Sequence, residues 1–373
     1  MVICKSELWN HLIWCKIVLL EKEKMSFRER SKKVIRFEND YTRGAHPRIL
    51  ARLMATNEEQ TSGYGTDPYC ESAAEMIKNL CQQPDADIHF LVGGTQTNLT
   101  VITSVLRPHE AVLAPSTGHI ATSETGAIEA TGHKVVTIPT QTGKITAEQI
   151  REVIDMPDNV HAPRIGMIFL SQSTELGGVY TKEELLAIKA VAVEFERPLF
   201  VDGARLGYAL ASAQCDMTLA DMAAICDIFY IGGTKVGALF GEAIVIVNEQ
   251  LKRDFRYIMK QRGGLLAKGR LLGVQFEEFF KDGLYDEVAK HAVEMSMRIK
   301  NALDEVGIPL KYPATTNQLF IEFTDEQFEK ISKDYALTPW LKGEGTMVAR
   351  LCTDWSTRVE DVEQLIEDIK GFK

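Results

Sequence analysis

Short apolar runs alternate with amphipathic segments along the chain up to about residue 265. Several runs are apolar at every position, which is typical of strands that helices cover on both faces of a parallel sheet. Thr146 and Thr181, each followed three residues later by Gln or Glu, match the capping box that begins a helix. The alternation predicts an α/β fold with a mostly parallel seven-stranded sheet. The predicted strands cover residues 88–92, 111–114, 134–138, 165–170, 199–202, 228–231 and 243–247.

The pattern changes in the last third of the chain. Apolar residues recur at helical spacing from Val288 to Val306, and Gly307 and Pro309 then end the helix. Alternating strands are predicted over 317–323 and 347–352, and helices near 325–334 and from 358. We therefore predict a smaller α+β domain over residues 266–373, which follows an N-terminal segment and a large domain over 25–265.

The first 24 residues carry no chemical motif. Their apolar stretch is interrupted by Lys5, Glu7 and Lys16, and no small-residue cleavage site follows it, so a secretory signal fits poorly. Met25 then opens a segment with the composition of an ordinary soluble N-terminus. Residues 1–24 are interpreted as a non-catalytic extension.

Composition excludes several classes of protein. The 52 acidic and 42 basic side chains give a net charge of -10, which argues against a nucleic-acid or anionic-membrane partner. No run of about 18 uncharged apolar residues is present, which excludes a membrane span. The seven cysteines include no C-x-x-C pair, so neither a structural zinc site nor any other metal site is predicted. We expect buried thiols in a cytoplasmic protein.

A lysine stands at the end of one buried strand. The run IFYIGGTK places Lys235 after an apolar strand and a Gly-Gly-Thr turn. Desolvation lowers the pKa of a buried ammonium, and a neutral lysine can form an imine with a carbonyl compound. A lysine that merely extends from the strand end into solvent would give the same pattern.

A carboxylate ends another strand. In LFVDGAR, Asp202 lies at the carboxyl edge of the sheet, where open α/β sheets bind their ligands. There it is either a turn former with Gly203 or the partner of a positive charge. On a pyridine ring, it would keep the nitrogen protonated. Arg205, three residues later, has the fork geometry that holds a carboxylate through two bonds.

Two further features lie where helices follow strands. Gly93, Gly94 and Thr95 link a strand to a helix, and exposed amides at a helix N-terminus bind phosphate. The turn lacks the G-x-G-x-x-G and G-K-[ST] patterns, so neither a dinucleotide site nor a P-loop is predicted. His119 near the start of another helix is either a surface residue or a ring that stacks on a planar cofactor and moves protons.

These four features occur in one order within one predicted sheet domain. A phosphate cradle at Gly94, a stacking ring at His119, a carboxylate at Asp202 and a strand-end lysine at Lys235 are together the parts that hold pyridoxal 5'-phosphate (PLP). We therefore predict PLP as the cofactor.

From Phe37 to the C-terminus the chain also resembles a known family. The segments DYTRGAHPRIL, GGTQTN, GHIATSETGA, TELGGVYT, VDGARLGYAL, GGTKVGA and MVARLCTDW are similar to those of low-specificity threonine aldolases, within the aromatic amino-acid β-eliminating lyases. That resemblance implies the aspartate-aminotransferase architecture, known as fold type I. It also implies a homodimer or homotetramer with the active site at the subunit interface, where Tyr64 or the QRGGLLAKGR segment reaches across.

The resemblance assigns a role to each candidate residue. It implies Lys235 as the Schiff-base lysine, Asp202 at the ring nitrogen and His119 as the stacking ring. The phosphate would lie on Gly94 and Thr95. The substrate carboxylate would lie on Arg205, Arg350 and Asn39, the last at a position where the family often has serine. Two departures from the family pattern are Phe200, where many members have histidine, and Gly93, where serine or asparagine is common.

The predicted reaction is cleavage of the Cα–Cβ bond of a β-hydroxy-α-amino acid. L-allo-threonine or L-threonine would give glycine and an aldehyde, with His119 or an ordered water as the base that removes the hydroxyl proton. One alternative is β-elimination on the same scaffold, because fold does not fix the reaction. Another alternative is a PLP-binding protein without turnover.

Overall fold

A seven-stranded sheet forms the centre of the large domain. The computed structural model describes residues 34–155 and 159–372. Within them, the strand order of this sheet is β2–β8–β7–β6–β5–β3–β4, and only β8 runs antiparallel to its two neighbours. The predicted α/β class with a mostly parallel sheet is confirmed. The strands are β2 (Asp87–Leu91), β3 (Glu110–Pro115), β4 (Val135–Ile138), β5 (Arg164–Ser171), β6 (Leu199–Asp202), β7 (Ile228–Gly232) and β8 (Glu242–Ile246). The predicted extension over residues 1–24 lies outside the described residues.

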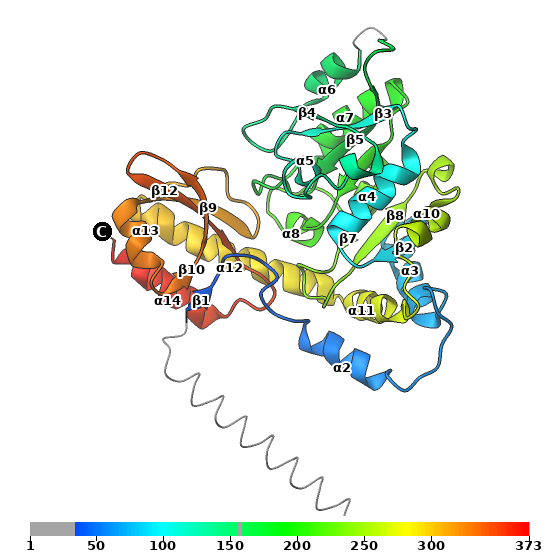
Figure 1. Cartoon of the computed structure of the whole chain (residues 1–373). Helices are drawn as coiled ribbons and strands as arrows, with labels where there is room; N and C mark the ends of the chain where they lie inside the picture. The colour runs from blue at the N-terminus through cyan, green and yellow to red at the C-terminus, as the bar shows by residue number, and fades with distance from the viewer. Residues whose placement is uncertain (1–33, 156–158, 373) are drawn as a thin grey trace, which may run out of the picture.

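Helices cover both faces of this sheet (Figure 1). Side chains alternate along β5, so that Ile168 packs with the helices of one face and Phe169 with those of the other. This double burial explains why the strands read as continuous apolar runs. One face carries α4 (Gly94–Val105) and α10 (Phe255–Gln261), and the other carries α3 (Pro68–Cys81), α6 (Ala147–Ile154), α7 (Lys182–Glu194), α9 (Leu219–Ile225) and α11 (Arg270–Lys281).

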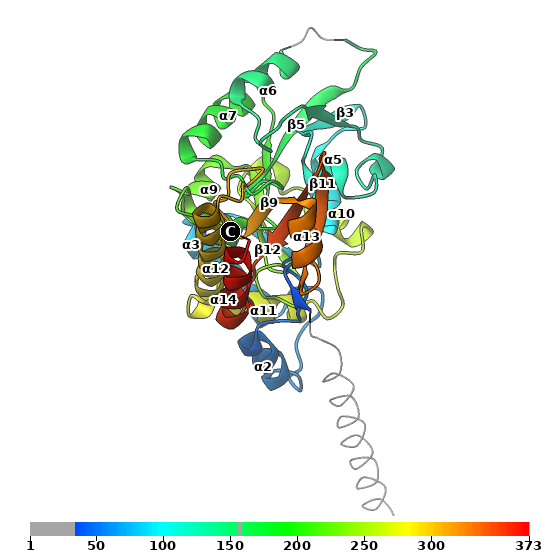
Figure 2. The ribbon, with the colours of Figure 1, turned by 90° about the vertical axis from the view of Figure 1, so that its left-hand side faces the viewer.

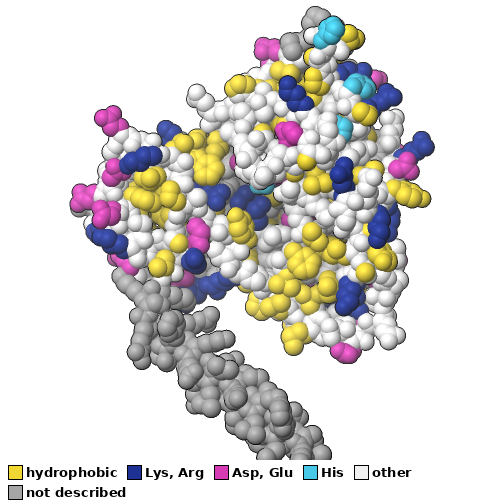
Figure 3. All heavy atoms as spheres, in the orientation of Figure 1, with side chains coloured by type: hydrophobic (Ala, Val, Ile, Leu, Met, Phe, Trp, Pro, Cys, Tyr) yellow, Lys and Arg dark blue, Asp and Glu magenta, His cyan; other side chains and the backbone are white. Residues whose placement is uncertain are grey.

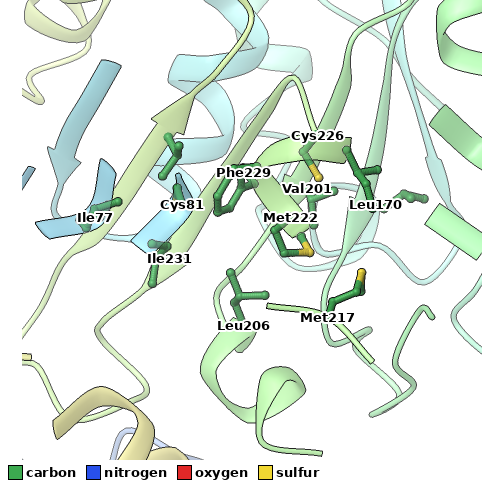
Figure 4. Close-up of a cluster of buried hydrophobic side chains, with 14 of the residues drawn as sticks. Ile77, Cys81, Leu170, Val201, Leu206, Met217, Met222, Cys226, Phe229 and Ile231 are labelled. Carbon is green, nitrogen blue, oxygen red and sulfur yellow. The ribbon is translucent and has the colours of Figure 1, made fainter. Parts of the chain in front are cut away.

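The largest cluster of buried hydrophobic residues shows how strands and helices meet. Figure 4 shows Phe229 of β7 and Val201 of β6 among Cys81 of α3 and Met222 of α9. These four residues are completely buried, and Cys226 beside them is 3% exposed. The five cysteines in the described part of the chain form no disulfide. Burial raises the pKa of Cys81 to about 12, so this thiol stays protonated and acts as a small apolar side chain.

Both predicted capping boxes are present. The Thr146 side chain accepts a bond from the Gln149 amide at the start of α6, and Thr181 does the same with Glu184 at the start of α7. Thr218 and Asp221 form a third box at the start of α9. Each box satisfies two amide groups that the first helical turn leaves free.

The small domain is built on a long helix and an antiparallel sheet. Helix α12 (Leu284–Val306) packs along α14 (Val359–Lys370), as Figure 2 shows. The sheet order is β11–β12–β9, with β9 (Gln318–Thr324) at one edge and α13 (Asp325–Ile331) following it. The remaining small-domain strands are β10 (Tyr335–Ala336), β11 (Thr338–Lys342) and β12 (Thr346–Cys352).

Two segments connect the domains. Helix α11 and the first half of α12 belong to the large-domain core, through Phe276 and Ala292 among others. The N-terminal strand β1 (Ile35–Arg36) pairs with β10 of the small domain instead. The predicted division at residues 265 and 266 therefore stays a prediction. Helix α2 (Pro47–Ala55) follows β1 and packs on α11.

Two short α-helices and two 3₁₀ turns complete the described elements. They are α5 (His119–Thr122), α8 (Leu206–Leu210) and the 3₁₀ turns at Glu129–Thr131 and Glu249–Leu251. No helix in the described ranges has both the length and the apolar character that a bilayer crossing requires.

Candidate active site

A cavity of about 1190 Å³ opens where the small domain meets the carboxyl ends of the sheet strands. Figure 3 shows Lys and Arg side chains gathered in the recess between the two domains. His119, Glu175, Arg205 and Lys235 line this cavity, and Arg350 joins them from the small domain. An adjoining recess shares the first four residues and adds Gly94, Ser171, Ser173, Asp202, Ala204 and Tyr230. The structure thus brings together six of the predicted residues, which are Gly94, His119, Asp202, Arg205 and Lys235 from the ends of the sheet strands and Arg350 from β12.

Lys235 follows β7 in a tightly packed turn. A Cβ atom on Gly203 would lie 1.7 Å from the Tyr230 carbonyl oxygen, so the turn after β6 can approach β7 only with glycine there. The Tyr208 hydroxyl donates a 2.6 Å bond to the Lys235 carbonyl oxygen and fixes the backbone at the lysine. Burial, with the nearby Arg205 guanidinium, lowers the pKa of Lys235. This favours the neutral, nucleophilic amine.

Asp202 is the last residue of β6 and is 5% exposed. Its Oδ1 atom accepts a 2.9 Å bond from the Ala204 amide, and its Oδ2 atom accepts a 3.0 Å bond from Asn98 Nδ2. A buried carboxylate with two donors keeps one orientation. It is therefore preorganised to meet a positive charge in the recess.

Asn98 connects Asp202 to His119 through a second carboxylate. Asn98 Nδ2 also donates to Glu124 Oε1 at 2.7 Å, and the same oxygen lies 2.8 Å from His119 Nδ1. The Glu124 side chain is completely buried, whereas that of His119 is 37% exposed. The order His119–Glu124–Asn98–Asp202 is a continuous hydrogen-bond network along one side of the recess.

Gly94 is the first residue of α4, whose amide groups face the recess end of the sheet. A Cβ atom on Gly94 would lie 3.2 Å from the Tyr230 hydroxyl oxygen, which leaves little room for a side chain. Gly93 precedes it as an N-cap without a side-chain bond, so the first-turn amides are available to an anion. Thr95 is exposed and is not among the residues that line either cavity.

Arg205 already has an internal partner. Its Nε and Nη2 atoms donate to the two oxygens of Asp40 at 2.7 and 3.0 Å. Asn317 Nδ2 donates to Asp40 as well, at 2.9 Å. Burial alone would raise the pKa of Asp40, but the charges of Arg205 and Lys235 outweigh burial and lower it. Asp40 thus stays ionised and leaves Arg205 one free nitrogen, Nη1, for a ligand.

Arg350 has more free donors than Arg205. Its Nη2 atom donates to the Glu38 carbonyl oxygen at 3.2 Å, and its guanidinium lies 5.5 Å from the centre of the Trp340 ring. Its Nε atom is buried without a hydrogen-bond partner among the described residues. Asn39 differs from both arginines, because its side-chain oxygen accepts from the Tyr41 amide and it does not line either cavity.

Comparison with known proteins places this site in a family. Residues 40–326 match the family described as β-eliminating lyase. The chain belongs to the β-eliminating lyase family. It is 30% identical over 339 residues to the low-specificity L-threonine aldolase of a Pseudomonas species, covering 90% of this chain and 97% of that protein.

Solved structures agree with this membership of the β-eliminating lyases. The structure of a threonine aldolase from Leishmania major superposes with a TM-score of 0.89 at 44% identity, covering 91% of this chain and 99% of that one. Aspartate aminotransferase from Thermus thermophilus, at 15% identity and a TM-score of 0.67, covers 95% of this chain and shares the fold. The expected fold type I architecture is therefore confirmed.

The donor set suits PLP, on which the β-eliminating lyase family depends. A lysine with a lowered pKa, a buried carboxylate and a helix N-terminus without room for a side chain surround one recess. They offer, in turn, a nucleophile for an aldehyde, a partner for a pyridinium nitrogen and amides for a phosphate. The buried Tyr230 hydroxyl adds a polar group on the same wall.

Sequence reasoning missed four carboxylate and amide side chains of the site. Asp40 and Glu124 lie in segments that the resemblance covers, but their polar surroundings suggest solvent exposure. Glu175 lies in such a segment too, and Asn98 follows the glycine turn by four residues. The sequence did contain one signal for Asn98, because this residue lies one helical turn after Gly94, the first residue of the helix predicted to bind the phosphate.

Proposed function

We propose that this protein cleaves β-hydroxy-α-amino acids such as L-allo-threonine and L-threonine to glycine and an aldehyde, with PLP as cofactor. The observation that carries the proposal is the large cavity, which Lys235 lines together with Arg350 and its unpartnered Nε atom. Lys235 also lines the adjoining recess that contains Asp202. The curated relatives and the Leishmania major structure bear the name threonine aldolase, which supports the same reaction.

Each wall of the recess would hold a different part of PLP. Lys235 would hold the aldehyde carbon, the amides at Gly94 and Thr95 the phosphate, and Asp202 the ring nitrogen. His119 would cover the ring face, since Glu124 fixes the orientation of its imidazole. When bound, PLP supplies a cationic ring that withdraws electrons from the substrate Cα.

The arginines position the substrate. Arg350 has an unpartnered Nε atom beside the cavity, and Arg205 has one nitrogen beyond its ion pair with Asp40. Two guanidinium groups on one carboxylate would fix the rotation about the bond between Cα and that carboxylate. The scissile Cα–Cβ bond is thereby held in one orientation, which lowers the entropic cost of reaching the transition state. Asn39, which caps its own turn, would assist only if it rotates away from the Tyr41 amide.

We also propose that the active enzyme is a homo-oligomer. The face that carries α2 and α11 exposes Leu50, Met54, Tyr64 and Leu271, and Figure 3 shows hydrophobic side chains gathered there. Tyr64 lies against the 261–270 segment, since its amide donates to the Ala267 carbonyl oxygen. Tyr64 lines a cavity separate from the active site of its own chain, which suits a residue that serves a neighbouring copy. The free, buried thiols suit a reducing compartment such as the cytoplasm.

Aldehyde release from purified protein tests the proposed reaction. We expect L-allo-threonine and, more slowly, L-threonine to yield acetaldehyde and glycine, with little pyruvate from L-serine or L-cysteine. Rapid pyruvate formation from serine or cysteine without acetaldehyde from either threonine would instead establish β-elimination. Absence of both products with PLP bound would favour a binding protein without turnover.

A further inference from the structure

Glu175 lies in a closed loop directly after β5. The Thr174 amide donates to the Gly178 carbonyl oxygen at 2.8 Å, and the Gly177 amide donates back to the Thr174 carbonyl oxygen at 2.9 Å. Gly177 has a positive φ of 83°, a conformation that glycine adopts without strain. The Gly177 carbonyl oxygen also accepts a 3.3 Å bond from the Thr316 hydroxyl group of the small domain. These contacts hold Glu175 in a fixed position at the domain junction.

The two carboxyl oxygens of Glu175 have different surroundings. Oε1 accepts a 2.6 Å bond from the Ser171 hydroxyl group and a 2.9 Å bond from the His119 amide. Oε2 is buried and has no hydrogen-bond partner within the described part of the chain. Glu175 lines both the large cavity and the recess, and among the described residues it is the single acidic side chain that lines the large cavity. One oxygen is thus held while the other is free to accept a proton.

The charges around Glu175 set its proton affinity. Burial, and then the neighbouring Asp202 carboxylate, raise the pKa of Glu175, whereas its bonds with Ser171 and His119 act in the opposite direction. Arg205 and Lys235 are the cationic residues that line both spaces with it. A carboxylate with a raised pKa is a stronger base than an ordinary glutamate.

We propose that Glu175 is the general base that accepts the β-hydroxyl proton during cleavage, an inference that rests on the aldolase function proposed above. The O–H proton moves to Oε2, the O–H electron pair forms the aldehyde C=O bond, and the Cα–Cβ bond breaks. The pair of that bond stays on Cα, which takes up one proton from solvent to give glycine. Glu175 returns its proton to solvent when the aldehyde leaves, so the cycle is balanced.

His119 is the competing candidate for the base. Its Nδ1 atom is engaged by Glu124, and its backbone amide is bonded to Glu175 itself. The Glu124 bond orients the ring, which suits a stacking role, and the amide bond places Glu175 beside it. Glu175 combines a free oxygen with a position on the wall of the substrate cavity, so it is the better placed of the two.

The variant Glu175→Gln, which preserves shape but removes the basic oxygen, tests the assignment. We expect kcat for L-allo-threonine to fall by about 10² to 10⁴, the usual contribution of general base catalysis. Deuterium exchange of the glycine α-proton, followed by NMR, involves no β-hydroxyl group and should stay within about threefold of wild type by the same reasoning. The cofactor absorbance should also be unchanged. Glu322→Gln, a half-buried glutamate on β9 outside both cavities, is the matched control.

Other results would overturn the assignment. Cleavage by Glu175→Gln at a rate near that of wild type would show that another group takes the proton. Equal losses of cleavage and of glycine exchange would show a structural role. Glu175→Asp, which keeps the charge, should recover part of the lost kcat, and a rate no better than that of Glu175→Gln would also contradict the proposal. If wild type releases no aldehyde at all, the proposed function itself is wrong, which this series separates from failure of the base assignment.

Discussion

His119 Nδ1 lies 2.8 Å from Oε1 of Glu124, a carboxylate with no exposed side-chain surface. A carboxylate at Nδ1 holds the proton on that nitrogen and fixes the plane of the ring. The orientation of the His119 ring therefore depends on Glu124, a residue that lines neither the cavity nor the recess. Glu124 also accepts from Asn98, which in turn holds Asp202.

Replacing Glu124 should lower the rate without weakening substrate binding. Glu124→Gln keeps the shape of the side chain but removes the negative charge from the group that bonds Asn98 and His119. We expect kcat to fall by about tenfold to a hundredfold, the value of one or two charged hydrogen bonds, with KM nearly unchanged. Steady-state kinetics measure both constants. Glu129→Gln, an exposed glutamate in the next turn, is the control, and a rise in KM alone would contradict the prediction.

Lys235 should be the lysine that carries the cofactor. Borohydride reduction of the PLP-loaded protein, followed by peptide mapping, should label Lys235. Lys235→Ala should lose both the label and turnover, because no other lysine among the described residues lines the recess. Lys268→Ala, in the QRGGLLAKGR segment, should keep both. A label on Lys268 would refute the site assignment.

The two arginines should differ in what their loss disturbs. Arg205→Met leaves the Asp40 carboxylate buried with only Asn317 as a side-chain partner, so we expect a loss of about 3–5 kcal/mol in the free energy of unfolding. Arg350→Met breaks no side-chain ion pair that the structure shows and should change stability by less than about 1 kcal/mol. It should instead raise KM for threonine. Urea unfolding and kinetics distinguish the two effects, and equal stability losses would contradict the prediction.

His89 should make the protein acid-sensitive. It is buried against Phe255, and burial, with Arg256, lowers its pKa to about 4. Since the unfolded chain binds the proton at about pH 6.5, stability is fully present above that pH and decreases as the pH falls to about 4. The shift corresponds to roughly 3 kcal/mol. His89→Gln should flatten the pH dependence of unfolding in this window, whereas His161→Gln, at an exposed site, should not.

Local chemistry made most of the fold predictable from the sequence. The mostly apolar runs located all seven strands of the large sheet, and the Thr146 and Thr181 boxes located two helix starts. Strand β11 was missed because its TPWLK sequence is mostly exposed, contains a proline and has no alternation to detect. It exists because β12 pairs with it along one edge.

The candidate site was predictable only where a residue type has one characteristic place. A lysine or aspartate at the end of an apolar strand is unusual, so the sequence singled out Lys235 and Asp202, which line one recess in the structure. Glu124 and Glu175 stand in polar loops, where a carboxylate normally faces water. Burial of these groups results from packing between segments that are distant in the sequence, and no local pattern records it. The partner of Arg205 lies 165 residues away, at Asp40.

The segment around Asp40 contacts both domains. Strand β1 pairs with β10, and the Phe37 carbonyl oxygen accepts from the Cys352 amide, so this segment is fixed to the small domain. Three residues later, the Asp40 carboxylate accepts hydrogen bonds from Arg205 of the large domain and from Asn317 of the small domain. A rotation of the small domain would therefore displace Asp40 and, through it, the Arg205 guanidinium that lines the cavity. The segment from Phe37 to Asp40 thus links the position of the small domain to the position of Arg205.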